Sequence, residues 1–175
     1  MRFELVDEKH SKYLETKRLY EAAFPPQERG RYELLFKRPK SVSQVLACYD
    51  EDLYVGFVML FIIEDIAHII YFAIEEDYRD MGYGTQILKQ LDIDYKDYRI
   101  IADVEKVEDN VMNNEQRIKR MSFYTRNGYK PSGIEYNWKG DNYLILINKG
   151  EITDKEFSNF WRTLAKMSNG ELREF

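Results

Sequence analysis

The chain has 175 residues and a net charge of −5, and 15% of its residues are aromatic. This length fits one domain (1–175) with one core, and a general nucleic-acid binder would need clustered Lys and Arg instead of this acidic balance. The single Cys48 excludes an internal disulfide, and two His with one Cys are too few for a usual zinc site. No signal peptide is visible, and the longest apolar run, Leu53–Ile63, is too short to span a bilayer. We therefore expect a cytoplasmic protein without a metal, nucleic-acid or membrane partner.

The first part of the chain predicts one strand and two helices, at residues 2–6, 11–24 and 31–37. The first helix has apolar side chains at helical spacing, and Ser11 is its expected N-cap. Pro25 and Pro26 end it, because proline cannot continue a helix. The loop after the prolines is either a simple turn between two helices or the wall of a substrate site. Glu28 within this loop is a candidate proton acceptor.

Three strands are expected next, at residues 43–49, 53–63 and 66–74. An acidic turn at 50–52 joins the first two as a hairpin, and the second is apolar on both faces, which is typical of a central strand. Short connections predict an antiparallel meander.

The most informative stretch follows the third of these strands. Arg79, Gly82 and Gly84 lie in a short loop before a strongly amphipathic helix that reaches Tyr95. Glycines let a backbone approach a ligand closely, and the first N–H groups of a helix favour an anion. The next strand, at 99–104, should run parallel to 66–74, since a helix crosses over between them. Taken alone, this loop is either an anion cradle or a plain glycine-rich turn.

The last part of the chain predicts a helix at 114–127 that Gly128 ends, and strands at 129–138 and 142–148. A final helix at 153–168 begins with a capping box, in which Thr153 and Glu156 bond each other's backbone.

Two motifs in this order resemble the GNAT N-acetyltransferase superfamily. The loop matches the family's Gln/Arg-x-x-Gly-x-Gly/Ala signature, and the segment 123–129 resembles its aromatic–Tyr pair followed by Gly and an aromatic. The resemblance covers residues 2–148 and leaves the final helix unexplained. It implies an α/β fold with a mixed, mostly antiparallel sheet that splays between two parallel strands and is flanked by helices.

The resemblance also implies acetyl-CoA as cosubstrate. Its pyrophosphate would lie on the loop residues Arg79, Asp80, Met81, Gly82, Tyr83, Gly84 and Thr85. Its pantetheine would pair with the preceding strand at Phe72, Ala73 and Ile74. Asn114 is either a further ligand of pantetheine or the substrate, or an ordinary N-cap.

The implied reaction is direct transfer of acetyl to a primary amine. Tyr124 matches the family's general acid for the leaving thiolate, and the alternative is a Tyr packed into the core. For the base, His68 is the first candidate because imidazole titrates near neutral pH, with Glu105 and Glu28 as alternatives. A half-buried His68 bonded to a backbone carbonyl is the structural alternative.

The sequence does not identify the amine that accepts the acetyl group. The acidic loops favour a small amine or polyamine, and a peptide amine stays open. A homodimer through the final strands also stays open. The rival class of function is an acyl-CoA-binding sensor or interaction module without turnover.

Overall fold

The computed structural model describes residues 1–108, 111 and 113–167. The strands are β1 (Arg2–Leu5), β2 (Ser43–Asp50), β3 (Leu53–Ile63), β4 (Ile66–Ile74), β5 (Arg99–Glu105), β6 (Lys130–Trp138) and β7 (Asp141–Ile147). The helices are α1 (Tyr13–Ala23), α2 (Tyr83–Asp94), α3 (Asn114–Arg126) and α4 (Asp154–Met167), with short 3-10 helices η1 (Tyr32–Phe36) and η2 (Glu76–Tyr78). The elements follow the predicted order, and the end of the predicted last helix at 168 lies outside the described residues.

The strands form one seven-stranded sheet in the order β1-β2-β3-β4-β5-β7-β6. All neighbours are antiparallel except β4 and β5, which are parallel. The helix α2 supplies the crossover that a parallel pair requires. The predicted mixed, mostly antiparallel α/β fold is confirmed.

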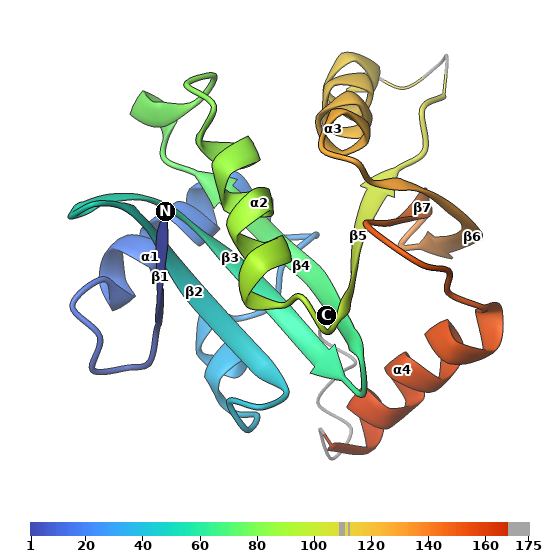
Figure 1. Ribbon diagram of the computed structural model, residues 1–175, viewed down its shortest axis with the longest axis horizontal. Coiled ribbons are helices and arrows are strands. Elements are labelled where there is room, and N and C mark those ends of the chain that lie inside the picture. The colour runs from blue at the N-terminus through green and yellow to red at the C-terminus, as the bar shows by residue number, and fades with distance from the viewer. Residues whose placement is uncertain (109–110, 112, 168–175) are drawn as a thin grey trace.

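The parallel pair splays in the middle of the sheet. β4 and β5 pair only from Ile66 with Arg99 to Ile69 with Ala102, and both strands then continue without each other (Figure 1). A bulge lies where they part, because Met59 and Leu60 of β3 pair with Tyr71 and Ile69 and leave Ile70 unmatched. A bulge bends its strand and increases the local twist. The bend therefore turns the end of β4 away from β5 and opens a gap.

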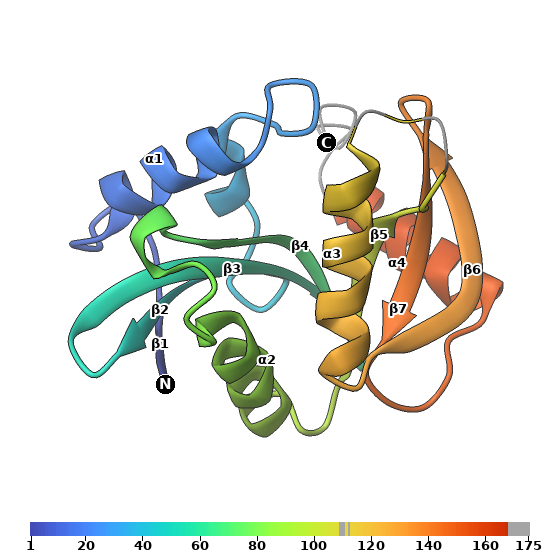
Figure 2. The ribbon, with the colours of Figure 1, turned by 90° about the horizontal axis from the view of Figure 1, so that it is seen from above.

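Helices cover both faces of the sheet (Figure 2). On one face α1, η1 and α4 enclose a large core that includes the rings of Tyr20, Tyr32 and Phe160. On the other face α2 and α3 enclose a second core with Leu88 and Tyr124. The gap between β4 and β5 is thus bordered by a separate hydrophobic layer on each side.

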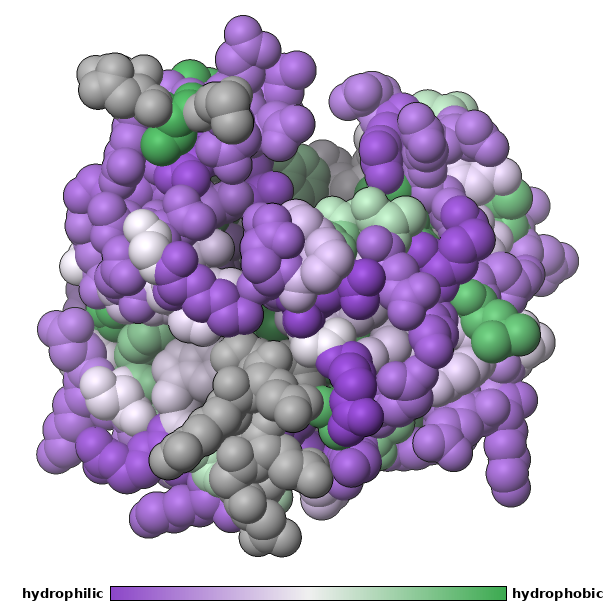
Figure 3. Space-filling model, turned by 180° about the vertical axis from the view of Figure 1, so that it is seen from behind, coloured by the Kyte–Doolittle hydropathy of each residue, from purple (hydrophilic) through white to green (hydrophobic). Residues whose placement is uncertain are grey.

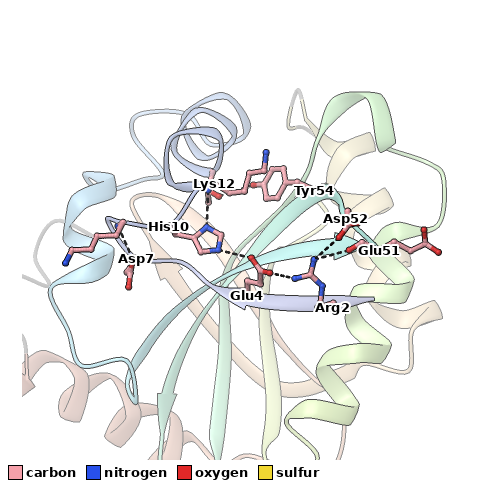
Figure 4. A network of polar contacts seen from close by, with 10 residues as sticks. Arg2, Glu4, Asp7, His10, Lys12, Glu51, Asp52 and Tyr54 are labelled. Carbon is pink, nitrogen blue, oxygen red and sulfur yellow. Dashed lines mark hydrogen bonds and ion pairs between the residues drawn. The ribbon is translucent and has the colours of Figure 1, made fainter.

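The start of α1 differs from the prediction. Ser11 does not cap the helix, which begins at Tyr13 with Lys12 as N-cap. The side chain of His10 satisfies the backbone N–H of Lys12 instead, because its Nδ1 accepts this group at 3.1 Å (Figure 4). The other ring nitrogen, Nε2, lies 3.0 Å from the carboxylate of Glu4 on β1. Sequence spacing cannot show that a strand supplies this partner.

The capping box of α4 is confirmed. Glu156 accepts the Thr153 N–H at 2.8 Å, and Thr153 Oγ1 accepts the Glu156 N–H at 3.2 Å. Among the described residues, none of the helices has the length and apolar composition that crossing a membrane would require.

Candidate active site

The gap between β4 and β5 opens into a cavity of about 1130 Å³. Its lining includes Phe72 and Tyr124 from the core under α2 and α3, and Tyr71 and Phe157 from the core under α1 and α4. The cavity therefore passes through the sheet and joins its two faces. Figure 3 shows a notch in the upper rim of the molecule, with hydrophobic side chains in its depth.

The glycine loop borders the cavity at the start of α2. Gly82 is the N-cap of this helix with a φ of 84°, a left-handed conformation that glycine adopts without a steric cost. No side chain caps the helix, and among the described residues no group accepts a hydrogen bond from the N–H groups of 81–85. Free N–H groups at the start of a helix, together with the helix dipole, favour a negative charge at this position.

The last residues of β4 turn backbone groups that do not pair with β3 toward the same cavity. Ala73 points its carbonyl oxygen at β3, where a Cβ on Gly56 would lie only 2.2 Å from it, so Gly56 must be glycine. Backbone groups alternate in direction along a strand, and those of Phe72 and Ile74 therefore point into the gap. The carbonyl of Ile74 accepts Arg79 Nε at 3.2 Å, which ties the loop to the end of the strand.

Helix α3 places Phe123 and Tyr124 on the opposite wall. Tyr124 is buried, lines the cavity, and has no hydrogen-bond partner among the residues that the structure describes. Burial raises the pKa of its phenol above the ordinary value, and the nearby Asp103 charge acts in the same direction. Phe123 packs against the loop, since a Cβ on Gly84 would lie 2.9 Å from its ring.

His68 lies behind the cavity wall and not in it. It is 0% exposed, and its ring packs among Phe157, Phe160 and Trp161 of α4. Its Nε2 lies 2.5 Å from the carboxylate of Asp103, and this carboxylate lines the cavity. Through this contact His68 supports Asp103 from behind.

Asp103 is the site residue that the sequence analysis missed. It lies on β5 where this strand has left β4, and it also accepts the Tyr136 hydroxyl at 2.7 Å. The available signal was one acidic residue inside the apolar run 100–104. The sequence could not show that His68 and Tyr136 converge on it.

The remaining predicted residues divide into two groups. Glu105 and Glu28 line the cavity, and buried Glu105 is paired with Arg120 of α3. Met81 and Asn114 are not part of the lining: Met81 is exposed, and Asn114 accepts the Glu108 N–H at 3.2 Å. The other predicted residues of β4 and the loop, Phe72, Ala73, Ile74, Arg79, Asp80, Gly82, Tyr83, Gly84 and Thr85, all border the cavity.

Residues 41–131, more than half of the chain, match the family model described as the acetyltransferase (GNAT) domain. The chain therefore belongs to the GNAT family of acetyltransferases. No curated protein matches it.

Solved structures share this fold at low sequence identity. A Bacteroides thetaiotaomicron protein assigned to the GNAT family matches with a TM-score of 0.80 and 20% identity, over 97% of this chain and 99% of the other. An Elizabethkingia anophelis GNAT acetyltransferase with acetyl-CoA bound matches with a TM-score of 0.58 and 12% identity, over 85% and 97% of the chains. An aminoglycoside 6'-N-acetyltransferase complexed with coenzyme A matches with a TM-score of 0.61 and 13% identity, over 87% and 100%.

Proposed function

We propose that this protein transfers an acetyl group from acetyl-CoA to a primary amine by direct attack of the amine. The observation that carries the proposal is the cavity through the sheet, which joins an anion cradle on one face to an acidic, aromatic chamber on the other. Similar folds that hold acetyl-CoA or coenzyme A support the choice of acyl donor.

The residues present fit this cosubstrate. The unpaired N–H groups of the glycine loop would hold the pyrophosphate, and Arg79 adds a positive charge next to it. The free backbone groups of Phe72 would pair with an amide of pantetheine, as an added strand pairs with a sheet edge, and the Ile74 N–H would remain for the reacting carbonyl. Together these contacts would direct the thioester toward the gap.

The proposed transfer needs two further groups from the chain. As the amine nitrogen bonds to the acetyl carbon, negative charge grows on the carbonyl oxygen, and the Ile74 N–H in the gap would stabilise it. The carbon–sulfur bond then breaks, and Tyr124 would donate its proton to the departing thiolate. A phenol is protonated at neutral pH, and Tyr124 lines the cavity without another hydrogen-bond partner among the described residues.

The amine must lose a proton before it attacks. We propose that the carboxylate of Asp103 pairs with the ammonium and accepts this proton, because Asp103 lines the cavity whereas His68 does not. His68 then acts as a positioning residue that orients Asp103 through the 2.5 Å contact. Glu105 is a weaker candidate, since Arg120 already neutralises it.

The test has two parts, which separate binding from turnover. Coenzyme A at millimolar concentration should raise the melting temperature, because a ligand that binds only the folded state stabilises it. Thiol release from acetyl-CoA should then depend on an added primary amine. A melting temperature that coenzyme A leaves unchanged would overturn the proposal. Stabilisation without amine-dependent thiol release would instead favour the acyl-CoA sensor.

A further inference from the structure

We infer that the acceptor is a primary amine carried on an aromatic or similarly flat apolar body, and not a polyamine or an aminoglycoside. The inference rests on the proposed function and adds the class of acceptor. It follows from the walls, the shape and the charges of the chamber on the α1 and α4 side of the sheet.

The walls of this chamber are mainly aromatic. Rings from four elements line it: Tyr71 of β4, Tyr136 and Trp138 of β6, Tyr143 of β7, and Phe157 and Trp161 of α4. Aromatic walls of this kind exclude water, bind apolar groups, and attract an ammonium through their faces. A substrate with many hydroxyl groups would leave most of them without partners against such walls.

Two of these rings form a stacked pair beside Asp103. Tyr136 and Tyr143 have ring centroids 5.4 Å apart and planes within 18° of parallel. The Tyr136 hydroxyl donates to Asp103 at 2.7 Å, so the pair lies next to the carboxylate that would receive the amine. An apolar ring packed against this pair would place an attached amine beside Asp103.

One side of helix α4 forms part of the chamber wall. Phe157, Trp161 and Ala165 follow each other at intervals of four residues and all line the cavity, whereas Phe160 and Leu164 are buried in the core. Side chains at this interval share one side of a helix. The helix lies outside residues 41–131, which match the family model, and outside the segment 2–148 that resembles the family in sequence.

Few charges are available to a polycation. Three carboxylates line the cavity on this side, from Glu28, Asp103 and Glu105, and Arg120 pairs with Glu105. Asp103 is bonded only by His68 and Tyr136 among the described residues, which leaves its charge for one ammonium. Glu28 lies in the loop after α1, where its charge would attract the cation toward the chamber. Arg120 thus leaves two negative charges, of which Asp103 is the one bonded to an aromatic side chain of the chamber wall.

Steady-state kinetics with four acceptors test the inference: 2-phenylethylamine, n-butylamine, spermidine and kanamycin. We expect kcat/KM for 2-phenylethylamine to exceed that for spermidine and kanamycin at least about tenfold, a difference that a buried ring readily supplies. A preference of that size for spermidine or kanamycin would overturn the inference and leave the proposed function intact. Absence of coenzyme A binding would overturn both.

Fluorescence gives a second readout, independent of turnover. The chain has two Trp, and both Trp138 and Trp161 line the cavity. In the presence of coenzyme A, which cannot react, 2-phenylethylamine should change their emission in a saturable way, and spermidine should not at equal concentration. The opposite order would contradict the inference.

Two variants locate the effect. Trp161→Leu should lower kcat/KM for 2-phenylethylamine about tenfold and change that for n-butylamine less than twofold, with the KM for acetyl-CoA unaltered. Trp161 also packs on the buried Phe160, with ring centroids 5.7 Å apart, so its replacement also removes a core contact. Trp138→Leu, on β6, therefore serves as a second test on another element. Tyr98→Leu is the control, because Tyr98 packs on Tyr95 outside the cavity. Equal losses for both amines in both Trp variants would overturn the inference.

Discussion

The two ends of the cavity are made of different parts of the protein. The cradle end is a contiguous segment, 79–85, that offers backbone N–H groups and needs small residues more than particular side chains. The chamber end is assembled from side chains of β4, β5, β6, β7 and α4, which lie far apart in sequence. Backbone donors serve any chain that keeps the loop conformation, whereas side chains set what can enter. The first end therefore accounts for the shared acyl donor, and the second for the individual acceptor.

The largest effect should come from the residue between the two ends. Tyr124→Phe removes the proposed acid and keeps the ring, so turnover should fall about 10²- to 10³-fold. The affinity for coenzyme A, measured by calorimetry, should stay nearly unchanged because the cradle is untouched. Unaltered turnover would make Tyr124 a structural residue of the α3 core.

A smaller loss is expected at the chamber end from the Asp103 carboxylate. Asp103→Asn should lower kcat/KM for the amine about 10²-fold, with the KM for acetyl-CoA unchanged. His68→Ala should cost less, about tenfold, because His68 acts through Asp103. Glu105→Gln is the matched comparison. A greater loss in that variant than in Asp103→Asn would move the base to Glu105.

A substitution in the glycine loop should disrupt the cradle end without affecting the chamber end. Gly84→Val places a branched side chain where a Cβ already lies 2.9 Å from Phe123, so the loop must shift against α3. Losing about one charge-assisted hydrogen bond should raise the KM for acetyl-CoA about tenfold. The KM for the amine should not change. Lys89→Val, on the exposed side of the same helix, controls for the helix propensity of valine.

The contrast between local motifs and contacts made far apart in sequence explains which parts of the fold could be predicted from the sequence. The strands and helices could be predicted to within a few residues, because their patterns are local: the apolar run of β3, the two glycines before α2, and the capping box of α4. The splay of β4 and β5 was implied by the family resemblance. The bulge at Ile70, which lies where the strands part, has no sequence pattern of its own.

The candidate site also has a part that local sequence patterns predict and a part that they do not. The cradle residues form one local motif, and the structure brings nearly all of them to the cavity. The predicted His68 is buried behind the wall, and Asp103 takes its place at the surface of the cavity. Which of two residues on neighbouring strands faces a gap depends on the register of the strands and on the helix that covers them. In this chain α4 covers His68, through packing that no short motif encodes.

The smallest effect concerns the anchor of α4, on which the chamber end depends. Glu156 accepts two hydrogen bonds from Thr153 and pairs with Arg99 at 2.9 Å, and these contacts lower its pKa to about 2. A carboxyl whose pKa is lower in the folded state stabilises the fold at pH values above its unfolded pKa, and this contribution is lost as the pH falls toward about 2.

Glu156→Gln keeps the length of the side chain and removes its charge. Exposed pairs of this kind contribute about 0.2–1 kcal/mol, so the melting temperature at pH 7 should fall by about 1–3 °C. The difference from the unmodified chain should shrink as the pH is lowered from about 4.5 toward 2. Glu151→Gln, which changes a neighbouring exposed carboxylate, is the matched control at pH 7. At pH 7 a loosened α4 should raise the KM for the amine and leave that for acetyl-CoA unchanged, because α4 lines only the chamber end. Equal changes in both KM values would show that the two ends of the cavity are not independent.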